Sequence, residues 1–266
     1  MAALSDYLEN KLLDHLLGGG DYTPAGTLYV ALFTAAPSDS GGGTECSGGS
    51  YARKSVTNNT TNWPVTSGAS KSNGTLISFA AATGSWGTVT HWGIFDASSG
   101  GNLLAWGAMD SSQAVASGDT ASFAIGALVI NMADTVFGDT WRNAVLNLAF
   151  GGTSYARPAT VYAALFTASP TSAGGGTEVY GGSYARVAVT NNSTNFPSAS
   201  GGSKANGTLI AWPTATDAWG TVTDMGLYTS SSSGSLLAFV GLTASKTVAS
   251  GDTYRASAGD LSISLD

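Results

Sequence analysis

The hydrophobic pattern at the start of the chain is that of an amphipathic helix. Leucines recur at three- and four-residue spacing across residues 4–17 and form one apolar stripe. Ser5 is a suitable N-cap, and the glycines at 18–20 are typical of a helix end. A second stripe at 145–150 is also followed by glycines. Because so apolar a stripe requires cover, we expect each helix to pack on its own domain.

After each helix the pattern changes to short runs rich in β-branched and aromatic residues, separated by clusters of Gly, Ser, Asn, Asp and Pro. In the first half these runs predict strands at 27–34, 52–56, 75–79, 89–95, 103–108 and 121–131. Short strands with glycine-rich turns are typical of antiparallel β structure rather than of a parallel sheet. The predicted fold class is therefore mainly β, with two tandem homologous antiparallel β-sandwich (jelly-roll-like) domains, each with one N-terminal α-helix.

The same pattern occurs twice in the chain. Residues 29–120 align with residues 162–253 without a gap, at a constant offset of 133, which is half of 266. A period this long indicates a duplicated domain rather than a solenoid of short units. We predict domains at 1–133 and 134–266, and we expect any residue essential to one copy to have a counterpart in the other.

The composition argues against nucleic-acid binding, a membrane span and secretion. Only 10% of the residues are charged and the formal net charge is −7, which opposes binding to the phosphates of nucleic acid. No apolar run reaches the length of about 18 residues that a membrane helix needs, and the first residues lack the apolar core of a secretory signal. Cys46 is the single cysteine and aligns with Val179, so we expect neither an internal disulfide nor a CxxC zinc site.

Few residues are candidates for catalysis. The two histidines, His15 and His91, align with Leu148 and Asp224, so neither belongs to the shared pattern. General acid and base catalysis most often uses histidine, and no Gly-x-Ser-x-Gly motif places a serine nucleophile. We therefore expect no hydrolytic triad.

The charged residues that both copies share are the next candidates. They are Asp6 and Asp139, Glu45 and Glu178, Arg53 and Arg186, Lys71 and Lys204, and Asp119 and Asp252. Glu45 and Asp119 could be the two carboxylates of a glycosidase. Both lie in glycine-rich turns, where acids more often bond to local backbone amides, and a pairing of Arg53 with either acid is equally simple. We favour the structural role and predict no catalytic, cofactor-binding or metal-binding residues and no cofactor.

Two further groups of residues have structural and functional interpretations. The runs Asn58–Asn62 and Asn191–Asn195 could hold Ca²⁺ but contain no carboxylate, so we expect turns there. Trp86 and its equivalent Trp219 are expected to be buried anchors. Trp92 and Trp141 have no aromatic counterpart in the other copy, and we expect them to be the residues to inspect for a contact surface.

The ordered motifs of the chain resemble those of a known family. The segments that carry the resemblance begin with Leu-Ser-Asp-Tyr-Leu-Glu-Asn-Lys-Leu-Leu-Asp at 4–14 and continue with Leu-Tyr-Val-Ala-Leu-Phe-Thr at 28–34, Gly-Gly-Ser-Tyr-Ala-Arg at 48–53 and Val-Ala-Ser-Gly-Asp-Thr at 115–120. They are similar to those of small virion proteins of tailed bacteriophages, usually described as tail fibre or minor tail proteins. The resemblance covers each half nearly end to end, and it implies a structural protein without catalytic residues.

These observations together predict a non-enzymatic virion protein, a tail fibre or minor tail component made in the host cytoplasm and assembled by protein–protein contacts with other tail or capsid proteins. A capsid decoration (head-stabilising) protein is the alternative within this class. A receptor- or glycan-binding adhesin that recognises a host surface glycan is the alternative from another class, and an enzyme ranks third. We expect a homo-oligomer without nucleic-acid or membrane partners. Three duplicated chains around an axis would offer six similar surfaces, a trimer with pseudo-six-fold symmetry.

Overall fold

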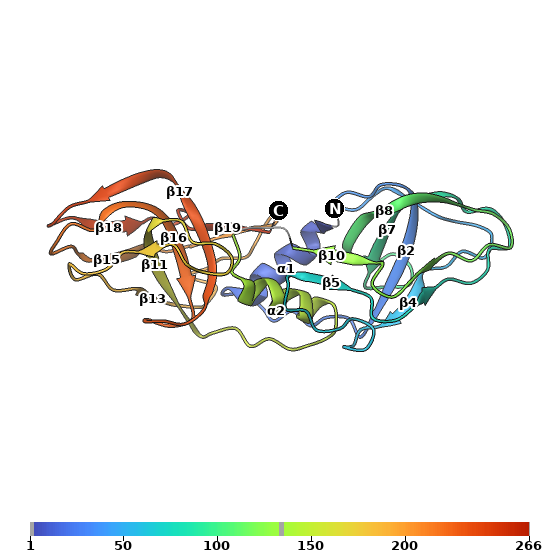
Figure 1. The fold of residues 1–266 in the computed structure, drawn as a ribbon, viewed down its shortest axis with the longest axis horizontal. Coiled ribbons are helices and arrows are strands. Elements are labelled where there is room, and N and C mark those ends of the chain that lie inside the picture. Colours follow the sequence, from blue (N-terminus) through green and yellow to red (C-terminus); the bar gives the residue numbers. More distant parts are fainter. Residues whose placement is uncertain (1–2, 133–135, 266) are drawn as a thin grey trace. The chain divides into compact units, whose positions relative to one another are not determined.

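The fold is mainly β, with two helices, as the computed structural model of residues 3–132 and 136–265 shows (Figure 1). Contacts divide the chain into two compact units. Unit 1 consists of Met1–Glu9, Thr23–Ala133 and Asn143–Tyr155, and unit 2 consists of Asn10–Tyr22, Asp134–Arg142 and Ala156–Asp266. Each unit thus contains most of one repeat together with one helix end from the other repeat. The division into domains 1–133 and 134–266 stays a prediction.

The two helices form where the apolar stripes predict them. Helix α1 spans Asp6–Leu16 and helix α2 spans Asp139–Ala149. The Oγ of Ser5 accepts a hydrogen bond from the amide of Leu8 (3.3 Å), which is the N-cap interaction expected for this serine. No helix within residues 3–132 and 136–265 has both the length and the apolar character of a membrane span.

The helices do not pack wholly on their own repeats, and that expectation was wrong. The second half of α1 lies in unit 2, where Asp14 pairs with Lys204, and the second half of α2 lies in unit 1, where Asn147 bonds to Lys71. The amphipathic pattern predicted that the stripe is covered but not which repeat covers it.

The main sheet of unit 1 is antiparallel. Its strands follow the order β1-β8-β7-β2-β3, and β4 also pairs with β2. Their bounds are Ala3–Leu4 (β1), Thr27–Ala35 (β2), Thr44–Glu45 (β3), Lys54–Thr57 (β4), Gly87–Phe95 (β7) and Leu103–Val115 (β8). Two small pairs complete the unit, β5 (Ser70–Ser72) with β10 (Val129–Asn131) and β6 (Ile77–Ser78) with β9 (Ser122–Phe123).

Unit 2 repeats this arrangement. Its main sheet has the order β12-β11-β16-β17, with β13 paired to β11. The bounds are Thr160–Ala168 (β11), Thr177–Glu178 (β12), Val187–Thr190 (β13), Gly220–Tyr228 (β16) and Leu236–Val248 (β17). The small pairs are β14 (Ser203–Ala205) with β19 (Ser262–Ser264) and β15 (Ile210–Thr214) with β18 (Thr253–Ala256). With all named strand pairs antiparallel in both units, the predicted class of two tandem β-sandwich domains is confirmed.

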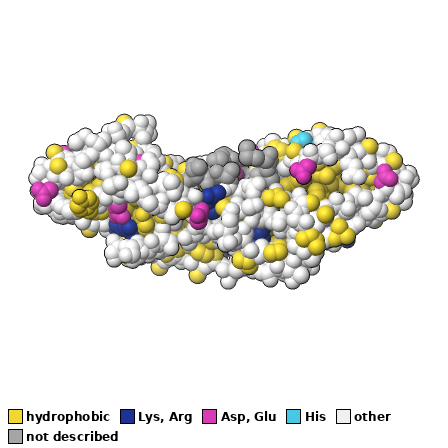
Figure 2. All heavy atoms as spheres, in the orientation of Figure 1, with side chains coloured by type: hydrophobic (Ala, Val, Ile, Leu, Met, Phe, Trp, Pro, Cys, Tyr) yellow, Lys and Arg dark blue, Asp and Glu magenta, His cyan; other side chains and the backbone are white. Residues whose placement is uncertain are grey.

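The tryptophans show where the cores lie. Trp86 and Trp219 are buried, as predicted, and their indole N–H groups donate to the carbonyl oxygens of Gly49 and Gly182, in the loops after β3 and β12 (2.9 Å in both). Trp92 and Trp141 are also buried, so the expectation that they mark a contact surface was wrong. Trp92 lies on the central strand β7, and Trp141 packs against Phe137 with ring centroids 5.5 Å apart. The outer surface carries few charges, as the face in Figure 2 shows.

Candidate functional site

Each unit has a groove at the same place in its fold. In unit 1 its volume is about 630 Å³, and in unit 2 the volume of the equivalent groove is about 440 Å³. The first turn of the helix, the loop after the first long strand and the loop before the last long strand of the sheet form the walls. In unit 1 these walls are residues 6–7, 39–43 and 100–103. This placement in both repeats makes the groove the candidate site.

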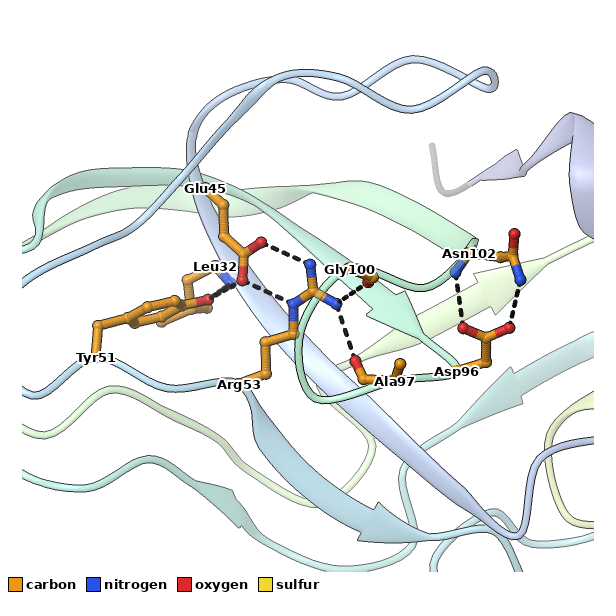
Figure 3. A network of polar contacts seen from close by, with 8 residues as sticks. All are labelled: Leu32, Glu45, Tyr51, Arg53, Asp96, Ala97, Gly100 and Asn102. Carbon is orange, nitrogen blue, oxygen red and sulfur yellow. Dashed lines mark hydrogen bonds and ion pairs between the residues drawn. The ribbon is translucent and has the colours of Figure 1, made fainter.

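Arg53 lines the unit 1 groove, and Figure 3 shows the polar contacts that hold its side chain. Arg53 donates from Nε to Oε1 of Glu45 (2.9 Å) and from Nη2 to Oε2 (2.8 Å), which is a bidentate ion pair. Its Nη1 donates to the carbonyl oxygens of Ala97 (2.9 Å) and Gly100 (2.8 Å). The guanidinium thus ties the segment just before β4 to β3 and to the loop between β7 and β8.

The same arginine stacks on an aromatic ring. Its Cζ lies 3.5 Å from the centroid of the Phe95 ring, a cation–π arrangement. Only 8% of the Arg53 side chain is exposed, so its charge depends on Glu45 and these carbonyls rather than on water for compensation.

Tyr51 completes the network. Its hydroxyl donates to Oε1 of Glu45 (3.0 Å) and accepts from the amide of Leu32 on β2 (2.9 Å). Burial raises the pKa of this hydroxyl, and the neighbouring carboxylate raises it further. Tyr51 is therefore a fixed hydrogen-bond donor rather than a group that exchanges protons near neutral pH.

Unit 2 reproduces the network residue by residue. Arg186 bonds to Glu178 through Nε (2.8 Å) and Nη2 (2.7 Å), and its Cζ lies 3.5 Å from the ring centroid of Tyr228. Burial alone would lower the pKa of Arg186, but the hydrogen bond and the charge of Glu178 outweigh burial and raise it. Tyr184 bonds to Glu178 as Tyr51 does to Glu45 (3.0 Å).

The walls differ between the two grooves. Unit 1 presents Tyr7, Asp39 and Asn102, where unit 2 has Thr140, Ser172 and Ser235. The carboxylate of Asp39 accepts from the indole N–H of Trp106 (2.9 Å). The amide side chain of Asn102 donates to Asp96 (2.7 Å), and its backbone amide does the same (2.7 Å). Arg53, Glu45 and Phe95 all line the groove of unit 1, whereas of the equivalent three residues only Tyr228 lines the groove of unit 2.

The arrangement does not support the glycosidase interpretation. Glu45 is held by Arg53 and Tyr51, whereas Asp119 accepts from the amide of Ala116 (2.9 Å) in its own turn and is not among the residues that line the groove in the described part of unit 1. Asp252 makes the same turn in unit 2 (2.9 Å). Two carboxylates flanking one bond are required for that reaction.

The remaining sequence candidates have local roles. His91 lies on β7 with its Nδ1 2.8 Å from Oγ1 of Thr90, and His15 accepts from the amide of Tyr22 (3.2 Å). The Oδ1 of Asn59 accepts from the amides at positions 61 and 62, which confirms the predicted turn. Within the described residues, no group of three His, Cys, Asp or Glu side chains is placed to hold a metal ion.

Sequence reasoning missed most of the groove. It included the ion pair of Glu45 and Arg53 as one alternative, but not Tyr51, Phe95 or Asp39. The available signal was the shared Gly-Gly-Ser-Tyr-Ala-Arg motif, in which the tyrosine and arginine are two positions apart and so can point to the same side of an extended segment.

The fold and the site define a class of duplicated antiparallel β proteins in which each unit carries an internally neutralised ion pair. The family model for the Podophage GP4 fiber I protein gp80 matches residues 3–131 and again residues 137–264. The chain belongs to this family of phage fibre proteins and contains its unit twice, which confirms the resemblance seen in the sequence. The family gives the chain a structural role in the virion. A search of curated proteins finds no match to the chain.

Proposed function

We propose that the chain is a non-enzymatic tail fibre component that assembles with neighbouring virion proteins through its β surfaces, with the paired grooves as docking places. The observation that carries the proposal is the ion-pair network that the two units share, on which the unit 1 groove is built and which the unit 2 groove adjoins at Tyr228. Arg53 and Arg186 are each neutralised by a carboxylate, two carbonyls and an aromatic ring. Such a groove offers a shaped surface with a few polar groups, and the shared glutamate and arginine are already engaged with each other.

Location in the particle separates the tail from the capsid. We expect a gold-labelled antibody against the chain to mark the tails of purified virions in electron micrographs. Quantitative mass spectrometry should give tens of copies at most per particle. Hundreds of copies with label over the shell would instead support the capsid decoration alternative.

We further propose that the chain forms a homo-oligomer. A trimer would present six similar units around one axis and could therefore match a six-fold site in the tail. Light scattering coupled to gel filtration should give the mass of three chains of 26.6 kDa. A single species with the mass of one chain at micromolar concentration would contradict the oligomer.

One observation favours a second candidate function, a glycan-binding adhesin. Tyr180 is 85% exposed and lies at a hollow of about 430 Å³ in unit 2, which Asp217 and Trp219 also line. An exposed tyrosine offers a ring face for stacking together with a polar tip, and a nearby carboxylate can accept bonds from sugar hydroxyls. The equivalent of Tyr180 in the first repeat is Ser47, so the exposed ring is specific to the second repeat.

A glycan array probed with the wild type and with Tyr180→Ala tests the adhesin. If the hollow binds glycan, the variant should lose the signal and the control Leu209→Ala, at another exposed apolar residue, should keep it. An array without signal for the wild type contradicts the adhesin and leaves the assembly function unaffected.

A further inference from the structure

The ends of the two helices are held in matched places, one in each unit. Unit 1 holds residues 143–155, which include the second half of α2, and unit 2 holds residues 10–22, which include the second half of α1. We define the helix seat as the residues around each of these ends. They are Asn58, Trp63, Thr66, Ala69 and Lys71 in unit 1, and Asn191, Phe196, Ala199, Gly202 and Lys204 in unit 2.

An asparagine closes each helix end. In unit 1, Nδ2 of Asn58 donates to the carbonyl of Ala149 (3.0 Å), and its Oδ1 accepts from the amide of Gly151. In unit 2, Asn191 makes the same two bonds, to the carbonyl of Leu16 (2.9 Å) and to the amide two residues later. The last carbonyls of a helix have no partner within the helix, so each seat satisfies groups that the helix itself leaves open.

Backbone amides of the seat bind side chains of the helix. In unit 1 the amide of Thr66 donates to Asn147 (2.9 Å) and the amide of Ala69 donates to Asn143 (2.8 Å). In unit 2 the equivalent amides donate to Asp14 (2.8 Å) and to residue 10 (3.1 Å). The acceptors are four residues apart, so they lie on one face of each helix.

A buried lysine completes each seat. The Nζ of Lys71 donates to Oδ1 of Asn147 (2.8 Å), and the Nζ of Lys204 donates to Oδ1 of Asp14 (2.6 Å). The relative exposures of the two lysines are 1% and 3%. The two seats therefore have the same geometry but differ in whether the lysine faces a carboxylate.

Glycine is required where each helix leaves its seat. Gly18 and Gly151 both have positive φ angles, of 67° and 129°. A Cβ atom would lie 2.3 Å from the carbonyl oxygen of Asn192 at the first and 2.9 Å from that of Trp63 at the second. The backbone of the helix end is in close contact with the backbone of the seat at these two glycines. The packing of each helix end in its seat therefore depends on steric fit as well as on hydrogen bonds.

We infer that each helix seat is a recognition site for the helix end of another copy of this repeat, and that the duplicated chain is an exchanged pair joined covalently. Each repeat carries both a seat and a helix end, yet each unit combines the seat of one repeat with the helix end of the other. The polar contacts that hold the ends are equivalent in the two units. The interaction therefore belongs to the repeat and does not require the peptide bond between the two copies.

Cutting the full chain between the repeats tests this inference. A protease recognition sequence is inserted between residues 133 and 134, and the folded protein is cleaved and then analysed by gel filtration and native mass spectrometry. We expect the halves to remain paired at the mass of the uncut chain. Pairs of two identical halves would also support recognition of another copy, whereas folded single halves at half that mass would overturn it.

Charge variants of the helix ends test the chemistry of the seats. In the cleaved protein, Asp14→Asn leaves Lys204 facing an amide and should raise the dissociation constant of the halves about tenfold or more. Asn147→Asp gives Lys71 a carboxylate and should lower it. Equal dissociation constants for the two variants and the wild type would contradict the inference.

Glycine variants provide a steric test with a matched control. Gly18→Val combined with Gly151→Val should separate the cleaved halves because the added side chains meet backbone in both seats. Gly20→Ala should leave them paired, since a Cβ there meets nothing within 4 Å. Circular dichroism of the uncut double variant establishes that the β structure persists. Cleaved halves that stay paired despite a folded double variant would overturn the role of the seats.

Discussion

At the scale of single residues, Lys71 and Lys204 have the same position in the two units but opposite energetic consequences. Burial lowers the pKa of Lys71 from 10.5 to about 8, and its bonded partner Asn147 brings no negative charge. Because the folded pKa is below the unfolded one, the charged lysine destabilises unit 1 fully below pH 8. That destabilisation disappears as the pH rises toward 10.5.

Replacing these lysines should therefore have effects of opposite sign. Lys71→Met should raise the free energy of unfolding at pH 7 by about 1–3 kcal/mol because it removes a buried charge that has no ion-pair partner among the described residues. Lys204→Met should lower it by a similar amount because Asp14 loses its ionic partner. Urea titrations at pH 7 measure both changes.

The pH dependence of the Lys71 effect gives a separate prediction. The advantage of Lys71→Met over the wild type should shrink by about 1 kcal/mol between pH 7 and pH 9, as the wild-type lysine loses its proton in the folded state. The comparison cancels the titration of tyrosines and of Cys46, whose pKa burial raises to about 11. A difference that does not vary with pH would show that Lys71 is uncharged or solvated in the folded protein.

Arg53 tests whether the groove depends on guanidinium geometry or on charge alone. Arg53→Lys keeps the charge but loses the bidentate pair with Glu45 and the stacking on Phe95, and should cost about 2 kcal/mol in unfolding free energy. Arg186→Lys should cost the same because its contacts are equivalent. The control Arg255→Lys, at an exposed position on β18, should change stability by less than about 0.5 kcal/mol. Equal changes in unfolding free energy at all three positions would mean that the guanidinium geometry of Arg53 and Arg186 contributes nothing to stability.

At the scale of elements, the sequence predicted most strands because β-branched and aromatic residues are concentrated in them and turn residues separate them. The predicted strands at 27–34 and 89–95 correspond closely to β2 and β7. β8 continues to Val115, beyond the predicted end at residue 108, because its polar second half still pairs with β7. β5 was missed because Ser70–Ser72 has no apolar residue, and the strand depends on its pairing with β10.

The helix caps give an element-scale prediction that separates the two repeats. Ser5 accepts from the amide of Leu8 and also donates to the carbonyl of Leu103, so Ser5→Ala should cost about 1–2 kcal/mol in unfolding free energy. Sequence alignment alone suggests that Gly138, its equivalent, could become serine without loss.

The structure predicts the opposite for that position. A Cβ at Gly138 would lie 2.1 Å from the carbonyl oxygen of Leu236, so Gly138→Ser should destabilise the protein rather than add a cap. Thermal melts of Ser5→Ala and Gly138→Ser, measured beside the wild type, check both expectations. A stabilised Gly138→Ser would show that the helix start moves freely away from β17.

At the scale of the whole molecule, the sequence showed the duplication but not the exchange of helix ends. The exchange cannot be read from the sequence because both helix ends have the same pattern of apolar and polar positions. Each apolar stripe is therefore compatible with the seat of its own repeat and with the seat of the other. The charge difference between Asp14 and Asn147 was readable from the alignment. Its meaning required the knowledge that both positions face a buried lysine.

The composition of the units predicts how the chain unfolds. Each unit contains residues from both repeats, so unfolding one repeat withdraws a helix end from the seat that the other repeat provides. We expect one calorimetric transition in which the van't Hoff enthalpy equals the calorimetric enthalpy of the whole chain. Independent domains at 1–133 and 134–266 would instead give a van't Hoff enthalpy near half of the calorimetric value. The double variant Gly18→Val and Gly151→Val disrupts both seats, so its van't Hoff enthalpy should fall to about half of the calorimetric enthalpy. Gly20→Ala should keep the single transition of the wild type.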